Sequence, residues 1–208
     1  EMKDGDTMLS FKEAGGFGGK TVDWDKVTVD DKKLEKSNLQ GEHTFTVLKS
    51  QASDLQFSSA TAKMKTVGDY ETRLRTEGNT ALTRAVLFDI SRYQNGKVDY
   101  DGSKAKAETF GGISRNGNTA KGNSLTVKNT QAGGLNAAYG GKNEGTAGGA
   151  TENKIKVENT GADGVKNVYG GFIENAANGS DATKNEVVIE KGKVTGSVYG
   201  GYTKGVGK

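Results

Sequence analysis

The stretches "KNVYGGFIEN" at residues 166–175 and "TGSVYGGYTK" at residues 195–204 share an aromatic residue followed by two glycines. The motif recurs at residues 139–141, and a variant with phenylalanine occurs at residues 110–112. The aromatic residues are spaced 29, 30 and 30 positions apart: Phe110, Tyr139, Tyr169 and Tyr199. A fixed period of this length is typical of repeat proteins, in which one structural unit stacks on the next. The sequence therefore predicts stacked coils.

Each repeat also contains an asparagine followed by a short run of alternating apolar and polar residues. The apolar positions lie two residues apart, which is the period of a strand with one buried face. They are Leu125 and Val127, Ile155 and Val157, and Val187 and Ile189. Polar, glycine-rich stretches of varying length separate the repeats, as loops do in stacked folds. These patterns predict an all-β protein, a right-handed parallel β-helix (β-solenoid) with Gly-rich loops.

Stacking of the coils predicts two structural ladders, because equivalent residues of parallel neighbouring strands lie about 4.8 Å apart. The aromatic ladder consists of Phe110, Tyr139, Tyr169 and Tyr199. The amide ladder, whose side chains hydrogen-bond along the stack, consists of Asn123, Asn153 and Asn185. We expect the glycine pair to form a sharp corner with positive φ beside each ring. In an alternative interpretation, the tyrosines form an exposed strip that binds sugar.

The first half of the chain shows less of this pattern. Of the 32 glycines, 10 lie in residues 1–108 and 22 in residues 109–208. Strands are predicted at residues 44–48, 70–75 and 85–90, and one short helical turn within residues 30–39. We interpret residues 1–108 as a less regular β region made of N-terminal coils of the same solenoid. Residues 109–208 then form about three repeats of about 30 residues each.

The composition narrows the functional classes. Only 32 % of the residues are hydrophobic, which is lean for a rounded core and suits a layered, elongated fold. The 29 basic and 26 acidic residues are interleaved, so we predict no nucleic-acid partner. The absence of cysteine excludes disulfides and thiolate metal sites. No apolar run reaches the ~18 residues of a membrane helix, and we expect the chain to be a segment of a longer protein.

Two carboxylate pairs could serve glycoside hydrolysis, which needs two acidic groups across the scissile bond. In each pair the acids flank an aromatic residue and fall on one strand face: Asp23 and Asp25 around Trp24, and Asp99 and Asp101 around Tyr100. Such pairs are also ordinary solvent-facing strand residues, which is the interpretation we favour. The one histidine, His43, lacks a Ser-His-Asp signature and is interpreted as a surface residue.

Metal and cofactor sites are not expected. Calcium-binding β-rolls carry an aspartate after the glycine pair in each repeat. Here the residues after the glycine pairs are Lys142, Phe172 and Tyr202. No phosphate-binding loop pattern occurs either. The sequence therefore predicts a protein without cofactor, metal or catalytic residues.

Residues 185–202, "NEVVIEKGKVTGSVYGGY", resemble repeats in the passenger domains of bacterial type V autotransporters. Residues 4–9, "DGDTML", resemble a strand opening of such passengers. The resemblance implies a non-enzymatic β-helix on the bacterial outer membrane or secreted from the cell, acting in adhesion or as a display stalk.

The resemblance also implies which partners the chain has. They are a surface protein or glycan of host or bacterium, and the membrane is reached only through a translocator barrel that this sequence lacks. The passenger itself is expected to be a monomer. The alternative function is a carbohydrate-active β-helix resembling glycoside hydrolases or polysaccharide lyases.

Overall fold

The computed structural model describes residues 6–11, 18–22, 30–51, 56–57, 63–77, 84–102, 104–130, 134–177 and 179–205. Of these residues, 59 % lie in strands and 4 % in helices, which confirms the predicted all-β class. The chain divides into two compact units. One consists of Glu1–Asn38 and Glu42–Ile90, and the other of Leu39–Gly41 and Ser91–Lys208.

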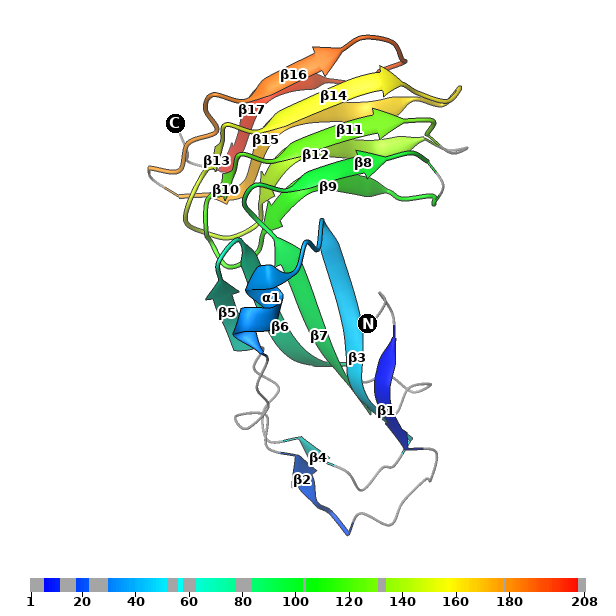
Figure 1. Cartoon of the computed structure of the whole chain (residues 1–208). Coiled ribbons are helices and arrows are strands. Elements are labelled where there is room, and N and C mark those ends of the chain that lie inside the picture. The colour runs from blue at the N-terminus through cyan, green and yellow to red at the C-terminus, as the bar shows by residue number, and fades with distance from the viewer. Residues whose placement is uncertain are drawn as a thin grey trace. The chain divides into compact units, whose positions relative to one another are not determined.

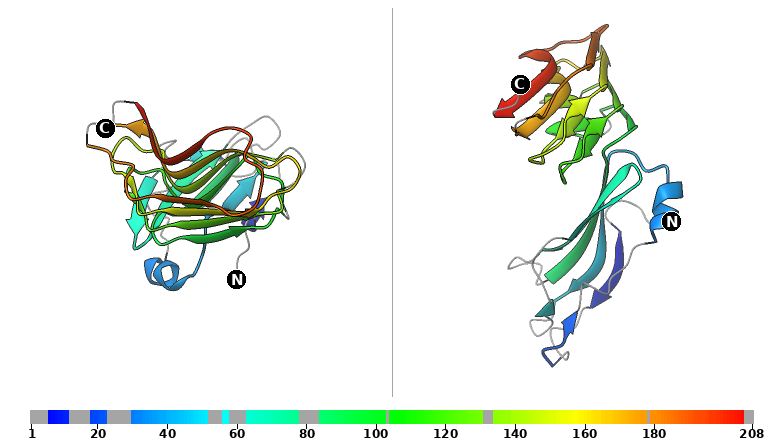
Figure 2. Two further views of the ribbon diagram at one scale, coloured as in Figure 1. Left: turned by 90° about the horizontal axis from the view of Figure 1, so that it is seen from above. Right: turned by 90° about the vertical axis from the view of Figure 1, so that its left-hand side faces the viewer.

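The second unit is a β-solenoid of about three turns, with two parallel four-stranded sheets (Figures 1 and 2). The first sheet has the order β16–β14–β11–β8: Glu186–Ile189, Lys154–Asn159, Ser124–Lys128 and Lys97–Tyr100. The second has the order β17–β15–β12–β9: Val198–Gly205, Val165–Ala176, Leu135–Asn143 and Glu108–Ser114. A short parallel pair joins β10 (Ala120–Lys121) to β13 (Ala150–Thr151). Each strand pairs in parallel with its equivalent in the next coil, as the repeat predicts.

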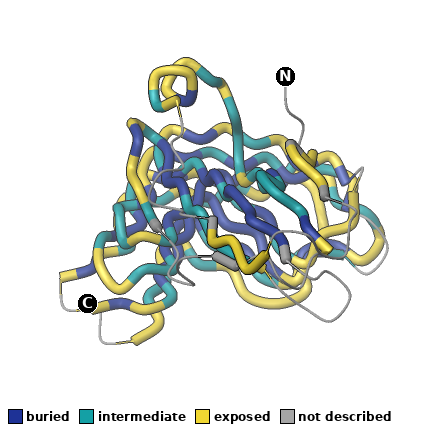
Figure 3. The backbone as a smooth tube through the Cα atoms, turned by 90° about the horizontal axis from the view of Figure 1, so that it is seen from below, coloured by how far each residue is buried: buried dark blue, intermediate teal, exposed yellow. Residues whose placement is uncertain are grey.

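The interior of the solenoid is filled by the alternating apolar residues of the repeat. Leu125, Val127, Ile155 and Val157 are fully buried and pack against the second sheet at Leu135, Ala138, Val165 and Val168. In Figure 3 the buried stretches follow the strands, and the exposed stretches follow many of the connecting loops. Val187 packs against this core, but Ile189 was predicted beside it and is 42 % exposed. The reason is that β16 is the edge strand of its sheet.

The chain turns sharply just before each ladder asparagine. The residues at that point have positive φ: Gly122 at 66°, Glu152 at 58° and Lys184 at 55°. Asn95, before Gly96 in the preceding coil, also has a positive φ of 53°. The glycine pairs lie inside β9, β12, β15 and β17 and have no positive φ. The predicted corner at the glycine pair is therefore wrong. At the turn before the ladder asparagines, Glu152 and Lys184 adopt the left-handed conformation although they carry side chains, at a cost of roughly 1 kcal/mol each.

The first unit contains a five-stranded sheet in the order β1–β3–β7–β6–β5. Its strands are Thr7–Phe11, Glu42–Ser50, Arg84–Arg92, Tyr70–Glu77 and Lys63–Val67, and a short parallel pair joins β2 (Thr21–Val22) to β4 (Gln56–Phe57). β1 pairs in parallel with β3, whereas β5 and β6 form an antiparallel hairpin. The predicted strands at residues 44–48, 70–75 and 85–90 are confirmed. The regular stack of coils begins at β8, ahead of residue 109.

The helical turn expected within residues 30–39 is α1 (Asp31–Lys36). Asp30 caps it, because its side chain accepts a hydrogen bond from the backbone N–H of Lys33 at 3.1 Å. Leu34 is its buried residue, and the Tyr70 hydroxyl donates to the carbonyl of Ser37 just after its end. The apolar contact and the cap explain a helix of this length in an all-β unit.

Candidate functional site

The structure brings the four aromatic residues of the repeat into one column on the outer face of the second sheet. Phe110, Tyr139, Tyr169 and Tyr199 pair in register across β9, β12, β15 and β17. Successive ring centroids lie 5.4, 5.1 and 5.3 Å apart, with interplanar angles of 15°, 11° and 8°. Each inner ring is therefore covered on both faces by its neighbours. A sugar needs a free ring face to stack on, and the inner tyrosines offer none.

A second column lies beside the first, formed by the residues that follow the glycine pairs. Phe172 and Tyr202 stack at 5.4 Å, and Lys142 lies level with Phe172 in the register of β12 and β15. Phe172 also contacts the rings of Tyr139 and Tyr169 edge-on, at 5.2 and 4.9 Å. These contacts join the two columns into one aromatic face. From the sequence, these positions were used only to argue against a calcium-binding repeat, and their role in packing was not predicted.

Tyr169→Ala is expected to lower the free energy of unfolding by about 2 kcal/mol, which is less than for a fully buried aromatic because Tyr169 is half-buried. The substitution removes a ring that contacts four others. Tyr199→Ala should cost less, because Tyr199 stacks on one neighbour of the column. Urea melts of both variants measure the difference. Equal and negligible losses would mean that the column does not support the fold.

The glycine pairs are required by what lies behind the aromatic face. A Cβ on Gly140 would come within 2.4 Å of the carbonyl oxygen of Gly170 in the next coil. A Cβ on Gly141 would come within 2.4 Å of the amide of Asn153. Both glycines thus face inward, which breaks the usual alternation and places Tyr139 and Lys142 together on the outer face. The motif combines a close backbone approach with room for the asparagine ladder.

The asparagines form the second ladder, inside the solenoid. The Asn123 side chain donates from Nδ2 to Asn153 Oδ1 at 2.9 Å, and Asn153 donates likewise to Asn185 Oδ1 at 3.0 Å. The backbone N–H of Asn123 and of Asn153 donates to the same two oxygens. Each Nδ2 also donates to a backbone carbonyl of the preceding coil, at Tyr93, Ala120 or Ala150. Asn123 and Asn153 are 1 % exposed, so these bonds satisfy groups that water cannot reach.

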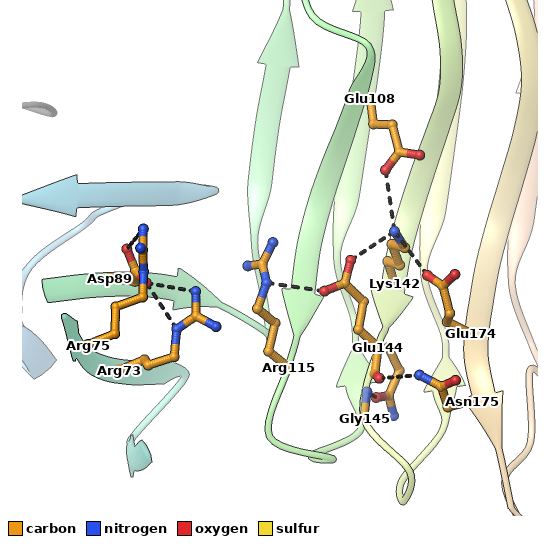
Figure 4. A network of polar contacts seen from close by, with 11 residues as sticks. Arg73, Arg75, Asp89, Glu108, Arg115, Lys142, Glu144, Gly145, Glu174 and Asn175 are labelled. Atoms are coloured by element: carbon orange, nitrogen blue, oxygen red, sulfur yellow. Dashed lines mark hydrogen bonds and ion pairs between the residues drawn. The ribbon is translucent and has the colours of Figure 1, made fainter. Parts of the chain in front are cut away.

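Lys142 is the most unusual residue of the outer face, because its side chain is only 6 % exposed. Its Nζ lies 2.8 Å from Glu144, 3.3 Å from Glu108 and 3.4 Å from Glu174 (Figure 4). It also lies 5.1 Å from the ring centroid of Tyr139. A buried ammonium ion needs such partners to offset its desolvation. Since the three carboxylates belong to three coils, Lys142 joins these coils electrostatically.

Burial and charge shift the pKa values of this face. Burial raises the pKa of Tyr139, and the nearby carboxylate of Glu108 raises it further. Burial acts to lower the pKa of Lys142, but the hydrogen bond to Glu144 and the charges of the surrounding glutamates outweigh it and raise the pKa. Both groups therefore hold their protons more tightly in the folded than in the unfolded chain.

Stability is expected to fall above about pH 10, where tyrosine and then lysine begin to lose protons in the unfolded chain. A raised folded pKa contributes stability that is complete below the unfolded pKa and is lost as pH rises. The contribution of Tyr139 alone should approach a loss of about 1.4 kcal/mol per pH unit as the unfolded tyrosine becomes fully deprotonated. Urea melts between pH 8 and 11 measure the slope, and Tyr139→Phe should reduce it. An unchanged slope in that variant would contradict the assignment.

The other sequence candidates do not assemble into a catalytic site. Tyr100 is part of the solenoid core, and its hydroxyl donates to the carbonyl of Lys104 at 3.0 Å, so it cannot stack on a sugar between Asp99 and Asp101. Asp99 and Asp101 are exposed. His43 in β3 stacks on Phe45 at 6.4 Å in the first unit. The pair around Trp24 lies outside the described residues.

The sequence did not predict the three glutamates that pair with Lys142, which are Glu108, Glu144 and Glu174. The available signal was weak, because glutamate and lysine occur throughout the chain. A lysine at the position where the next two coils carry Phe172 and Tyr202 was the one irregularity that marked the place.

The described residues offer neither a metal cluster nor a membrane helix. Across the described ranges, no group of three or more histidine, cysteine, aspartate or glutamate side chains is arranged to hold a metal ion. The described part of the chain has no helix long and apolar enough to cross a membrane. Comparisons of the chain with protein-family models, with curated proteins and with solved structures find no match, so its site rests on its own geometry.

Proposed function

We propose that this chain is a non-enzymatic scaffold of the bacterial cell surface, a passenger segment of an autotransporter that serves as an adhesin or a display stalk. The resemblance of residues 185–202 to passenger repeats supports the assignment, and the β-solenoid fold is compatible with it. The partner is then a protein or glycan of a host or bacterial surface. The location is the outer membrane surface or the medium.

One observation carries the scaffold proposal: repeated side chains contact their counterparts in neighbouring coils. The aromatic rings stack on one another, and the asparagines bond along the axis. Charged residues do the same, through ion pairs between coils at Lys121–Glu152, Lys128–Glu158, Lys154–Glu186 and Lys156–Glu190. Side chains that contact their counterparts in the next coil stabilise the stack, as in solenoids whose repeats contact only their neighbours.

A carbohydrate-active enzyme is the second candidate, because Glu108, Glu144 and Glu174 gather beside aromatic rings on one sheet face. Glycoside hydrolysis needs one carboxylic acid that donates a proton and one carboxylate that attacks or activates water. Here all three carboxylates pair with Lys142, and Glu144 pairs in addition with Arg115 at 3.1 Å. Such pairing favours cohesion of the stack over acid–base chemistry.

Binding and hydrolysis assays on the whole chain separate the two candidates. The chain is applied to an array of glycans and extracellular-matrix proteins, and is incubated with a panel of polysaccharides. We expect saturable binding to a surface component and no release of new sugar ends. Polysaccharide cleavage that Glu108→Gln abolishes would replace the scaffold proposal with the enzyme. Neither binding nor cleavage would leave the chain as a stalk without adhesive activity.

A further inference from the structure

A compact charged cluster lies on the sheet of the first unit, which carries none of the ladder residues. Asp89 in β7 lies between β3 and β6, the neighbouring strands of the sheet. Arg73 donates to Asp89 Oδ2 from Nε at 3.0 Å and from Nη2 at 2.8 Å (Figure 4). Arg75, two residues along the same strand, donates to that oxygen from Nε at 2.7 Å. Thr44 Oγ1 of β3 donates to Asp89 Oδ1 at 3.0 Å.

The cluster carries more positive than negative charge. Two guanidinium groups share one carboxylate, and in the described part of the chain no second carboxylate pairs with either arginine. The side chains of Arg73 and Arg75 are 33 % and 30 % exposed, whereas that of Asp89 is 17 % exposed. Solvent therefore reaches the arginines more readily than the acid that holds them.

In the described part of the chain, the guanidinium groups of Arg73 and Arg75 keep unused donors. A guanidinium has five N–H groups in a planar fork. Arg73 and Arg75 each bond to Asp89 through Nε and Nη2, although the second contact of Arg75 is long at 3.5 Å. The Nη1 groups of both arginines take no part in these bonds. They remain for an acceptor with two or more oxygens, such as a carboxylate or a sulfate.

Asp89 holds the arginines in place over a wide pH range. Its burial acts to raise its pKa, but the hydrogen bonds from Arg75 and Arg73 outweigh burial and lower the pKa. The carboxylate thus stays ionised at neutral pH. Arginines ordered before a ligand arrives lose less side-chain entropy on binding than mobile ones.

We propose that Arg73 and Arg75 form a binding site for an oxyanion, with Asp89 as the residue that positions them. The ligand is a sulfate or carboxylate group, free in solution or carried by an acidic saccharide. The site goes beyond the scaffold proposal, because it lies in the first unit and its chemistry does not depend on how the solenoid functions.

The first test is an NMR titration of the whole chain, following the Nε–H signals of the arginine side chains. Sodium sulfate replaces sodium chloride at constant ionic strength, so that general screening does not change. We expect the signals of Arg73 and Arg75 to shift and saturate, and that of Arg115 to stay constant. A parallel titration with a sulfated tetrasaccharide distinguishes the sources, because saturation at lower concentration than with free sulfate assigns the site to saccharides. No saturable shift with either probe would overturn the proposal.

Three variants sharpen the test. Arg75→Gln should weaken binding about tenfold, because it removes a charge and its donors from the site. Arg115→Gln is the matched control, since it removes the same charge from the second unit. If Arg75→Gln and Arg115→Gln weakened binding equally, the effect would come from the net charge of the protein, and the proposed site would be wrong.

The third variant, Asp89→Asn, should weaken binding severalfold, because the neutral amide no longer holds the two guanidinium groups in place. This variant keeps both arginines, so it tests the proposal even if Arg75→Gln does not fold. Unchanged or stronger binding by folded Asp89→Asn protein would contradict the positioning role of Asp89.

Discussion

Asn153→Ala is expected to lower the free energy of unfolding by about 3–5 kcal/mol, a larger loss than we expect for Tyr169→Ala. The side chain is buried at the centre of the amide ladder. Its oxygen accepts from the backbone and side chain of Asn123, and its nitrogen donates to Ala120 and Asn185. Removal leaves several of these groups buried without a partner, at about 1–3 kcal/mol each before relaxation.

Asn175→Ala is the matched control for the ladder, because Asn175 is exposed and its side chain donates to the carbonyl of Glu144. We expect a loss below about 1 kcal/mol there. Asn185→Ala should fall between the two, since Asn185 is only half-buried and donates to Ala150. Urea unfolding followed by circular dichroism measures all three. If Asn153→Ala and Asn175→Ala were equally mild, the ladder would have no special role in stability.

Gly140→Ala is expected to destabilise the solenoid by about 3 kcal/mol, at the upper end of the range for overpacked sites. The added methyl group would lie 2.4 Å from the Gly170 carbonyl oxygen and 3.0 Å from the backbone of Lys154. These atoms belong to the backbone of neighbouring strands, so they cannot rotate away as a side chain would. The strands must separate, which weakens the parallel pairing of β12 and β15.

Gly200→Ala provides the control at the same position of the motif, in the edge strand β17. A Cβ there meets only the Asn185 carbonyl oxygen, at an ordinary 3.7 Å. We expect a change within about 1 kcal/mol, with some gain because alanine loses less entropy than glycine in a strand. Urea melts of the two variants compare the same chemical change with and without a covering coil. Equal losses would show that intrinsic preference, and not the coil-to-coil approach, selects glycine.

Much of the fold could be predicted from the sequence, because a repeat that stacks by translation places like residues above one another. The period of the aromatic residues indicated the coil length, and the alternation at Leu125, Val127, Ile155 and Val157 indicated the buried face. The ladder positions followed from the same logic. In the first unit, the sequence located three strands and the helical turn, whereas the cap at Asp30 was recognised only in the structure.

Contacts between different positions of the repeat could not be predicted from the sequence, because they depend on the tertiary structure. The corners lie at Glu152 and Lys184, residues with no preference for positive φ, because the coil must turn where the next asparagine enters the ladder. The glycine pair makes room for that asparagine and forms no corner, which no local propensity encodes.

Lys142 meets Glu108 and Glu174 from neighbouring coils, and Asp89 meets Arg73 and Arg75 across a sheet. The sequence by itself determined what repeats and which face of each strand is buried, since both follow from spacing along the chain. The partners of each charge depend on strand order and on the register of neighbouring strands, and these arise only when the tertiary structure forms.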